Sequence, residues 1–287
     1  MPANAFKIGS AVFNFAEKTA IMGILNVTPD SFSDGGRYDT VWKAVEHAFR
    51  LKEDGADIID IGGESTRPGS ERISADDELE RVLPVIEALN GKLGLPISID
   101  TYKAEVARRA LEAGADMVND ISGLAFDPGM AALVASKGCP VVIMHTLGDP
   151  KTMQNEVRYD NPVDDLKRYF EERLEFAQAA GIAKENIIID PGIGFGKKLA
   201  HNVELIRGLS SFAELGCPIL LGASRKSFIG QILGLPADER LEGSLAAAAI
   251  GTANGVSVLR VHDVKQTARL RDVCDVLCGK RKAEENK

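Results

Sequence analysis

The feature that most constrains this chain is a unit that recurs along most of its length. Seven times, a stretch with helical character ends at a glycine and leads within a few residues into a short apolar run. An eighth run, 20–26, precedes the first helix. A glycine just past a helix supplies the left-handed turn that ends it, and apolar runs without alternation are typical of parallel strands buried on both faces. Eight such units predict an α/β fold, a closed (β/α)8 TIM barrel.

Polar residues stand at or near the end of the apolar runs. The later runs cover 57–62, 96–100, 116–119, 141–145, 187–190, 219–222 and 256–262. In a barrel of this kind the carboxyl ends of the strands form the rim where catalysis takes place. The residues expected at that rim are Asn26, Asp100, Asn119, His145, Asp190, Arg260 and His262.

The uninterrupted pattern predicts a single domain over residues 1–287. Residues 6–15 alternate around Gly9 and Ser10 like a short β-hairpin, which we expect to close the bottom of the barrel. We expect the charged run 279–287 to be a solvated tail. Neither a run of about 18–20 apolar residues nor a basic segment before an apolar stretch is present, so a membrane span or secretory signal is not expected.

The four cysteines favour a cytosolic protein with reduced thiols. Cys274 and Cys278 lie one helical turn apart, which leaves a thiol pair as the alternative. The net charge of −8 argues against nucleic acid or an anionic membrane as a partner. Several cations nevertheless map to the rim, which predicts a locally basic mouth for a small anionic molecule. These are Arg67, Arg225, Lys226, Arg260 and His262.

Two rim loops are longer than a strand-to-helix connection needs. Residues 26–36 follow the first barrel strand, and residues 62–70 follow the second. Both contain glycines, and Arg67 could bind a phosphate or carboxylate. They are interpreted as lids that exclude water, with ordinary surface loops as the alternative.

The polar residues Asp100, Asn119 and Asp190 suit a flat, nitrogen-rich heterocycle. A carboxylate pairs with two N–H donors on one edge of such a ring, and an amide can both donate and accept. Lys226 could donate to a ring carbonyl. The alternative is a metal site formed by the two carboxylates and His145.

Arg260 and His262 occupy alternate positions of the last strand and therefore share one face. Both can reach one phosphate at the end of the barrel where phosphates are commonly bound. The alternative for His262 is a structural histidine whose ring is hydrogen-bonded within the fold.

Taken together, these segments resemble the dihydropteroate synthase family. The matching stretches are 23–36, 64–70, Asp100, 119–120, 190–197, 224–227 and 260–262. The resemblance implies a transferase of folate biosynthesis that joins 6-hydroxymethyl-7,8-dihydropterin diphosphate to 4-aminobenzoate and releases pyrophosphate. It also implies a cytoplasmic homodimer, a Mg2+ cofactor and competition by sulfonamides at the aminobenzoate site.

The resemblance further implies a role for each matching residue. The pterin would be held by Asp100, Asn119, Ile121, Met144, Asp190, Gly222, Lys226 and Arg260. The diphosphate would be held by Asn26, Arg260 and His262, with Asn26 also at the metal. The aminobenzoate would be held by Phe32, Thr66, Arg67, Pro68, Phe195 and Ser227. The catalytic set would be Asp100, Lys226, Arg260, His262 and Asp34.

Other functions stay open at this stage. The Asp100, Asn119 and Asp190 set also resembles that of pterin-dependent methyltransferases, and a non-catalytic pterin-binding paralogue would share it. A Schiff-base aldolase would use Lys226 as its nucleophile.

Overall fold

The barrel predicted from the repeat is confirmed. The computed structural model describes residues 5–28, 37–65, 70–148 and 157–282. Within these residues, eight parallel strands hydrogen-bond in the order β8-β7-β6-β5-β4-β3-β10-β9. A parallel bridge between Ile189 and Ile219 joins the last strand to the first. The strands are β3 Ala20–Asn26, β4 Ile58–Gly62, β5 Ile97–Asp100, β6 Met117–Asp120, β7 Val141–Met144, β8 Ile187–Asp190, β9 Leu220–Leu221 and β10 Val258–Val261.

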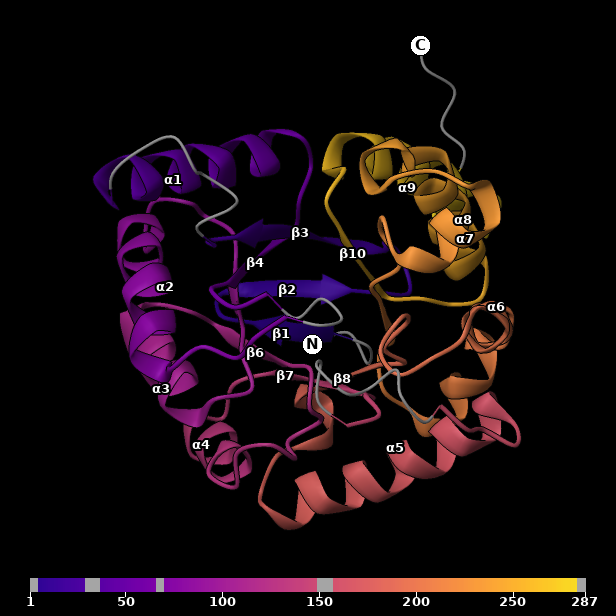
Figure 1. Ribbon diagram of the computed structural model, residues 1–287, viewed down its shortest axis with the longest axis horizontal. Helices are drawn as coiled ribbons and strands as arrows, with labels where there is room; N and C mark the ends of the chain where they lie inside the picture. The colour runs from indigo at the N-terminus through magenta and orange to yellow at the C-terminus, as the bar shows by residue number, and fades with distance from the viewer. Residues whose placement is uncertain (1–4, 29–36, 66–69, 149–156, 283–287) are drawn as a thin grey trace.

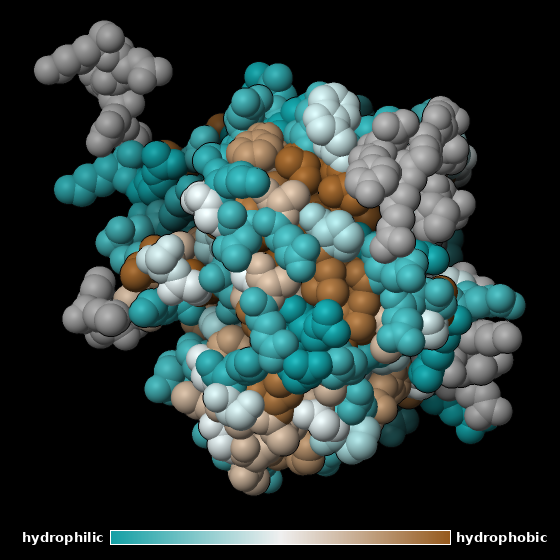
Figure 2. Space-filling view, turned by 90° about the vertical axis from the view of Figure 1, so that its left-hand side faces the viewer, coloured by the Kyte–Doolittle hydropathy of each residue, from teal (hydrophilic) through white to brown (hydrophobic). Residues whose placement is uncertain are grey.

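Helices surround the strands as an outer ring (Figure 1). They are α1 Arg37–Glu53, α2 Ala75–Leu89, α3 Ala104–Ala113, α4 Met130–Lys137, α5 Pro162–Ala179, α6 Leu199–Arg207, α7 Ser227–Leu233, α8 Leu241–Ala253 and α9 Val264–Leu277. Short 3-10 helices cover Lys184–Asn186, Leu209–Leu215 and Ala237–Glu239. The side of the ring that carries α1 to α4 exposes many hydrophilic residues around separate hydrophobic areas (Figure 2).

Local sequence explains where these helices begin and end. Asn161 accepts hydrogen bonds from the backbone N–H groups of Val163 and Asp164, and Pro162 occupies the first turn of α5. These are favourable residues for a helix start, since the first N–H groups lack partners within the helix. At the end of α4, Gly138 adopts the left-handed conformation with φ of +60°. Gly114 likewise follows α3 directly, as predicted, whereas Gly94 stands five residues after the last residue of α2.

The N-terminal hairpin closes the bottom of the barrel, as predicted. Its strands are β1 Ala5–Ile8 and β2 Ala11–Asn14, paired antiparallel. Phe6 and Ile8 are buried against one apolar layer of strand residues. This layer comprises Ala20, Met22, Ile58, Met117, Val142, Ile188, Leu220 and Val258. Because these residues come from the strands themselves, the hairpin covers the end of the barrel that lies opposite the rim.

The start of the C-terminal run is attached to the barrel. Lys280 Nζ lies 2.9 Å from Thr19 Oγ1 and 3.2 Å from the carbonyl oxygen of Val256. Thr19 in turn donates to the buried carboxylate of Asp275 on α9. The prediction of a solvated tail from residue 279 onward is therefore wrong for Lys280. Within the described ranges, no helix combines the length and the apolar character that a membrane crossing requires.

Candidate active site

The candidate site is built from strand residues that point into the barrel two positions above the apolar layer. Side chains alternate across a strand, so the residue two positions after an inward-facing one also faces inward. Ile58, Met117, Ile188 and Val258 belong to the apolar layer. Two residues further along the same four strands, the chain places Asp60, Asn119, Asp190 and Arg260. A polar layer therefore lies directly above the apolar one.

Arg260 joins two carboxylates in this polar layer. Its Nε lies 2.6 Å from Asp60 Oδ2, and its Nη2 lies 2.5 Å from Asp100 Oδ2. The amide nitrogen of Asn119 donates to the same Asp60 oxygen at 3.1 Å. Asp60 is fully buried, and Asp100 and Asn119 are also buried. The network thus connects β4, β5, β6 and β10 across the interior of the barrel.

Burial and charge shift the ionisation of this network. Burial raises the pKa of Asp100 to about 7, although the charge of Arg260 opposes that shift. Burial also raises the pKa of Asp190, against its hydrogen bond from Gly192 and the charges of Lys226 and Arg260. Arg260 itself stays charged, because Asp60 and Asp100 raise its pKa although burial opposes the cation. Asp100 and Asp190 lie within the electrostatic reach of the same two cations, which places them at one site.

Two acceptor atoms of the network lack a hydrogen-bond donor in the part of the chain that the structure describes. Among the described residues, Asp60 Oδ1 and Asp100 Oδ1 are buried without a hydrogen bond. A buried acceptor without a donor costs about 1–3 kcal/mol. A ligand with N–H donors would satisfy such atoms, and Asp100 stands at the rim end of β5.

Two glycines keep the space next to the carboxylates open. A Cβ atom built on Gly222 would lie 3.8 Å from Asp190 Oδ2, and one on Gly62 would lie 3.5 Å from Asp100 Cβ. Larger side chains at these positions would extend over the carboxylates. The two strand ends thus leave room for a flat ligand.

Lys226 and Phe195 lie together at the rim. The Nζ atom of Lys226 lies 4.1 Å from the centre of the Phe195 ring, a cation–π contact. Phe195 is buried in an apolar cluster with Tyr102, Ile121 and Met144. This cluster offers an aromatic and aliphatic wall beside the polar layer.

His262 is held by Ser224. Its Nδ1 lies 3.0 Å from Ser224 Oγ, which also accepts the backbone N–H of His262 at 3.3 Å. In the tautomer in which the serine hydroxyl donates to Nδ1, the ring proton is on Nε2. Burial, with Arg260 and Arg225 nearby, lowers the pKa of His262 to about 3. The ring is neutral at pH 7 and can donate one hydrogen bond to an anion.

The mouth is less basic than predicted at two of its cations, Arg260 and Arg225, because each is paired with carboxylates. Arg260 bonds to Asp60 and Asp100, and Arg225 forms contacts of 3.0 and 2.5 Å with Asp263. A sequence pattern counts these cations but does not show their pairing. A phosphate bound by both Arg260 and His262, as predicted, would therefore compete with Asp60 and Asp100 for the N–H groups of Arg260.

The structure brings most of the predicted residues to one end of the barrel. Asn26, Asp100 and Asp190 end their strands, and Asn119 stands one residue before the end of β6. Asp100 and Asn119 are direct register partners. Ser227 begins α7 and is exposed. Phe32, Asp34, Thr66, Arg67 and Pro68 lie outside the described residues, as do most of the two loops interpreted as lids.

The metal alternative is not supported in the part of the chain that the structure describes. No group of three or more histidine, cysteine or carboxylate side chains able to hold a metal occurs among the described residues. His145 instead faces Lys197, with 2.9 Å between Nδ1 and Nζ. A cation beside the ring opposes a second positive charge at this nitrogen.

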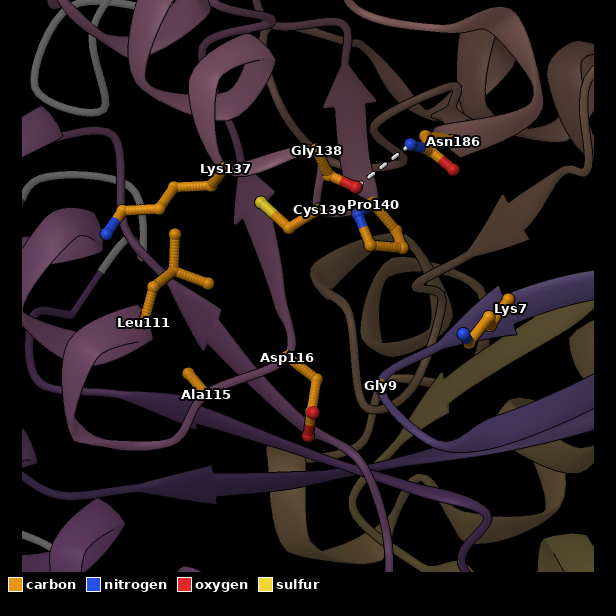
Figure 3. Close-up of a pocket in the computed structure, with 10 residues that line it drawn as sticks. All are labelled: Lys7, Gly9, Leu111, Ala115, Asp116, Lys137, Gly138, Cys139, Pro140 and Asn186. Carbon is orange, nitrogen blue, oxygen red and sulfur yellow. Dashed lines mark hydrogen bonds between the residues drawn. The ribbon is translucent and has the colours of Figure 1, made fainter.

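A separate cavity of about 380 Å3 opens at the opposite end of the barrel (Figure 3). Asp116 and Pro140, which line it, precede β6 and β7, and Lys7 belongs to the hairpin. The only hydrogen bond between the residues drawn joins Asn186 to the Gly138 carbonyl. None of the predicted site residues lines this cavity. The polar layer at the rim, and not this cavity, carries the candidate chemistry.

Sequence reasoning missed three residues of the site. Asp60 lies inside an apolar run instead of at its end, although a charge in a buried strand is itself a signal. Lys197 was part of the matched stretch 190–197 but had no role assigned to it. Ser224 gave no separate signal, since its contact with His262 spans 38 residues of sequence.

Comparison with known proteins agrees with this geometry. The family described as pterin binding enzyme matches residues 22–262. The dihydropteroate synthase of Synechocystis sp. is 47% identical over 271 residues, which cover 94% of each chain. The Yersinia pestis dihydropteroate synthase in a sulfonamide drug complex has a TM-score of 0.91 and 43% identity, and the match covers 96% of this chain and 99% of that one. Xanthomonas albilineans dihydropteroate synthase with 4-aminobenzoic acid has a TM-score of 0.89 and 43% identity, covering 98% and 99%.

Proposed function

Because the chain belongs to the family of pterin binding enzymes, we propose that it is a dihydropteroate synthase of folate biosynthesis. It transfers the pterinylmethyl group of 6-hydroxymethyl-7,8-dihydropterin diphosphate to the amino group of 4-aminobenzoate. The products are 7,8-dihydropteroate and pyrophosphate. The relatives named above, one of them with 4-aminobenzoic acid and one with a sulfonamide drug, support this assignment.

One observation carries the proposal from the structure itself. Asp100 is a buried carboxylate with one oxygen bonded to Arg260 and the other without a donor among the described residues. A pterin presents several N–H donors along one edge of a flat ring. Asn119 and Asp190 add an amide and a second carboxylate to the same layer, and Gly222 leaves space above Asp190. The Met144 and Ile121 side chains supply apolar contact for the ring faces.

The cations then serve the leaving group. Breaking the C–O bond to the diphosphate develops positive charge on the pterin methylene and negative charge on the departing oxygens. Arg260 and the Nε2–H group of His262 stabilise the oxygens, and the carboxylate of Asp100 offsets the methylene charge. By sequence alone, Asp34 is a second candidate for offsetting the positive charge on the methylene. Positioning and charge stabilisation supply most of the rate.

The aminobenzoate approaches from the side of Phe195 and Ser227. Phe195 offers an aromatic surface next to Lys226, and Ser227 stands exposed at the start of α7. Thr66, Arg67, Pro68 and Phe32 complete this site by resemblance. The arylamine attacks as a neutral nucleophile, so the site needs no strong general base.

The residues fit a Mg2+ ion that is held mainly by the substrate. Mg2+ keeps several waters and is commonly bound through one or two protein ligands together with substrate phosphates. The amide oxygen of Asn26, at the rim end of β3, would be one such ligand. A bound Mg2+ would neutralise part of the diphosphate charge.

The decisive experiment is a product assay with both purified substrates and Mg2+. We expect pyrophosphate and 7,8-dihydropteroate in equal amounts, with inhibition by sulfonamides that is competitive with 4-aminobenzoate. Folded protein that binds the pterin diphosphate but releases no pyrophosphate would identify a non-catalytic paralogue instead. Methyl transfer from a methylated folate would identify a methyltransferase, and trapping of Lys226 by borohydride would identify an aldolase.

Pterin binding is expected to depend on the ionisation of Asp100. Burial raises the pKa of this carboxyl to about 7, and the ligand needs the carboxylate to accept its N–H groups. The dissociation constant should therefore rise about tenfold per pH unit as the pH falls below 7, and stay level above it. Calorimetric titrations between pH 5.5 and 8.5 would measure this. The same slope in Asp100→Asn would assign the titration to another group.

We also propose that the protein is a cytoplasmic homodimer with one domain over residues 1–287. The four cysteines are free, which agrees with a reducing compartment.

The helices α7, α8 and α9 lie on one side of the barrel (Figure 1). They carry the exposed apolar residues Ile232, Leu233, Ile250 and Leu277. Exposed apolar side chains on these three helices favour association with a second copy. Light scattering should give the mass of two chains, and Ile250→Glu should shift it toward one.

A further inference from the structure

Lys197 is a buried cation that the proposed chemistry does not use. It is 4% exposed and lies in the segment between β8 and α6. Its Nζ atom lies 2.9 Å from the carbonyl oxygen of Phe195. The same atom lies 2.9 Å from Nδ1 of His145 and 3.4 Å from the His145 carbonyl oxygen. An ammonium group has three N–H donors, so these three contacts account for all of them.

The partners of Lys197 belong to two different segments of the rim. His145 directly follows β7, and its ring packs edge-on against Tyr169 with 4.6 Å between the ring centres. Burial and the charge of Lys197 lower the pKa of His145, so the ring is neutral and accepts at Nδ1. Lys197 therefore ties the backbone near Phe195 to the fixed end of a barrel strand.

Phe195 depends on such ties, because it lies outside the regular elements. The glycines Gly194 and Gly196 on either side of it have φ of +85° and +61°. The backbone N–H of Gly194 donates to Asn202 at 2.7 Å, and Tyr159 donates to the Gly196 carbonyl oxygen at 3.0 Å. Glycine-rich backbone loses more conformational freedom on folding than other segments do. Hydrogen bonds to successive residues are what hold this one in a single conformation.

The cost of burying this amino group indicates that it has a role beyond filling space in the core. Burial lowers the pKa of Lys197 to about 7, because moving an ammonium group out of water disfavours its charged form. A methionine would fill nearly the same volume without that cost. It would also leave the Phe195 carbonyl oxygen without its donor.

We propose that Lys197 is a positioning residue for the aminobenzoate site, because it fixes the backbone of Phe195 and thereby the ring that lies beside Lys226. This inference rests on the proposed function. The pterin carboxylates Asp100 and Asp190 stand on β5 and β8, outside the glycine-flanked segment that Lys197 holds, although the charge of Lys197 reaches Asp190. Loss of Lys197 should therefore affect the second substrate more than the first.

The test is a comparison of Lys197→Met with Lys198→Met, whose exposed side chain is the adjacent matched control. For Lys197→Met we expect the KM for 4-aminobenzoate to rise at least about tenfold. We expect kcat and the calorimetric dissociation constant of the pterin diphosphate to change by less than about threefold. Lys198→Met should leave all three values unchanged.

A second variant keeps the test independent of the stability of the first. Tyr159→Phe removes only the hydroxyl that donates to the Gly196 carbonyl oxygen, and should raise the same KM by about two- to fivefold. An unchanged aminobenzoate KM in both variants, or an equal loss of pterin affinity, would overturn the positioning role. A wild-type protein that releases no pyrophosphate would instead overturn the proposed function, so the two failures are distinguishable.

Discussion

Replacement of Arg260 by methionine is expected to reduce kcat/KM at least about a thousandfold and to lower the free energy of unfolding by about 3–5 kcal/mol. Arg260 bonds to both Asp60 and Asp100, and both carboxylates are buried. Its removal leaves two buried carboxyl groups inside the barrel without their cation. The same change removes a donor for the leaving diphosphate. Urea unfolding and steady-state kinetics measure the two effects separately.

Two further variants sharpen this prediction. Arg269→Met, on the exposed face of α9, removes an arginine of the same kind from outside the site and should change neither quantity. Adding Asp60→Asn to Arg260→Met removes one of the two carboxyl groups left without a cation and should recover part of the stability without recovering activity. Full recovery of turnover in the double variant would mean that Arg260 acts only by neutralising Asp60.

Replacement of Gly222 by valine is expected to weaken binding of the pterin diphosphate at least about a hundredfold, which is about 2.7 kcal/mol. The free energy of unfolding should change by less than about 1 kcal/mol. Among the described residues, a Cβ at this position meets only Asp190 Oδ2, at 3.8 Å, an ordinary contact. The added methyl groups extend into the space that the pterin needs above Asp190. Calorimetric titration and urea unfolding together measure the prediction.

Gly222→Ala provides the graded control. It adds one carbon where valine adds three, so its effect on affinity should fall between those of the wild type and Gly222→Val. If Gly222→Val binds the pterin normally, then the ring lies elsewhere and the assignment of Asp190 to the pterin fails with it. A large loss of stability would show instead that this strand end does not tolerate a branched side chain.

The rim residues were predictable because strand position and chemistry agree at each of them. Asp100 and Asp190 end their apolar runs in the sequence, and they end β5 and β8 in the structure. Asn119 was also expected at a strand end, but β6 continues to Asp120. The shift by one residue does not matter for the site, since Asn119 still shares the inward face with Met117.

The contacts between distant segments were not predictable from the sequence. The pattern of cations suggested a basic mouth, but the partners of Arg260 lie 200 and 160 residues away in the chain. Asp60 lies two residues before its strand ends, so a reading confined to strand ends passes over it. Lys197 was hidden for a different reason, because a lysine after a glycine-rich turn normally lies on the surface. Only the fold reveals that this one is buried.

The residues of the two long loops depend on resemblance and not on geometry. Phe32, Asp34, Thr66, Arg67 and Pro68 lie outside the described residues, so their roles remain predictions. Periodicity could place these loops at the rim, since they follow strand ends. It could not assign them a substrate, because a loop sequence has no repeating pattern from which side-chain directions follow.

The N-terminal hairpin closes the barrel at one end, so its interior opens only at the rim. Phe6 and Ile8 close the barrel below the polar layer. A molecule that enters the barrel at the rim therefore also leaves at the rim. The substrate that binds deepest in the barrel therefore has to bind first. A second molecule bound nearer the rim blocks its dissociation.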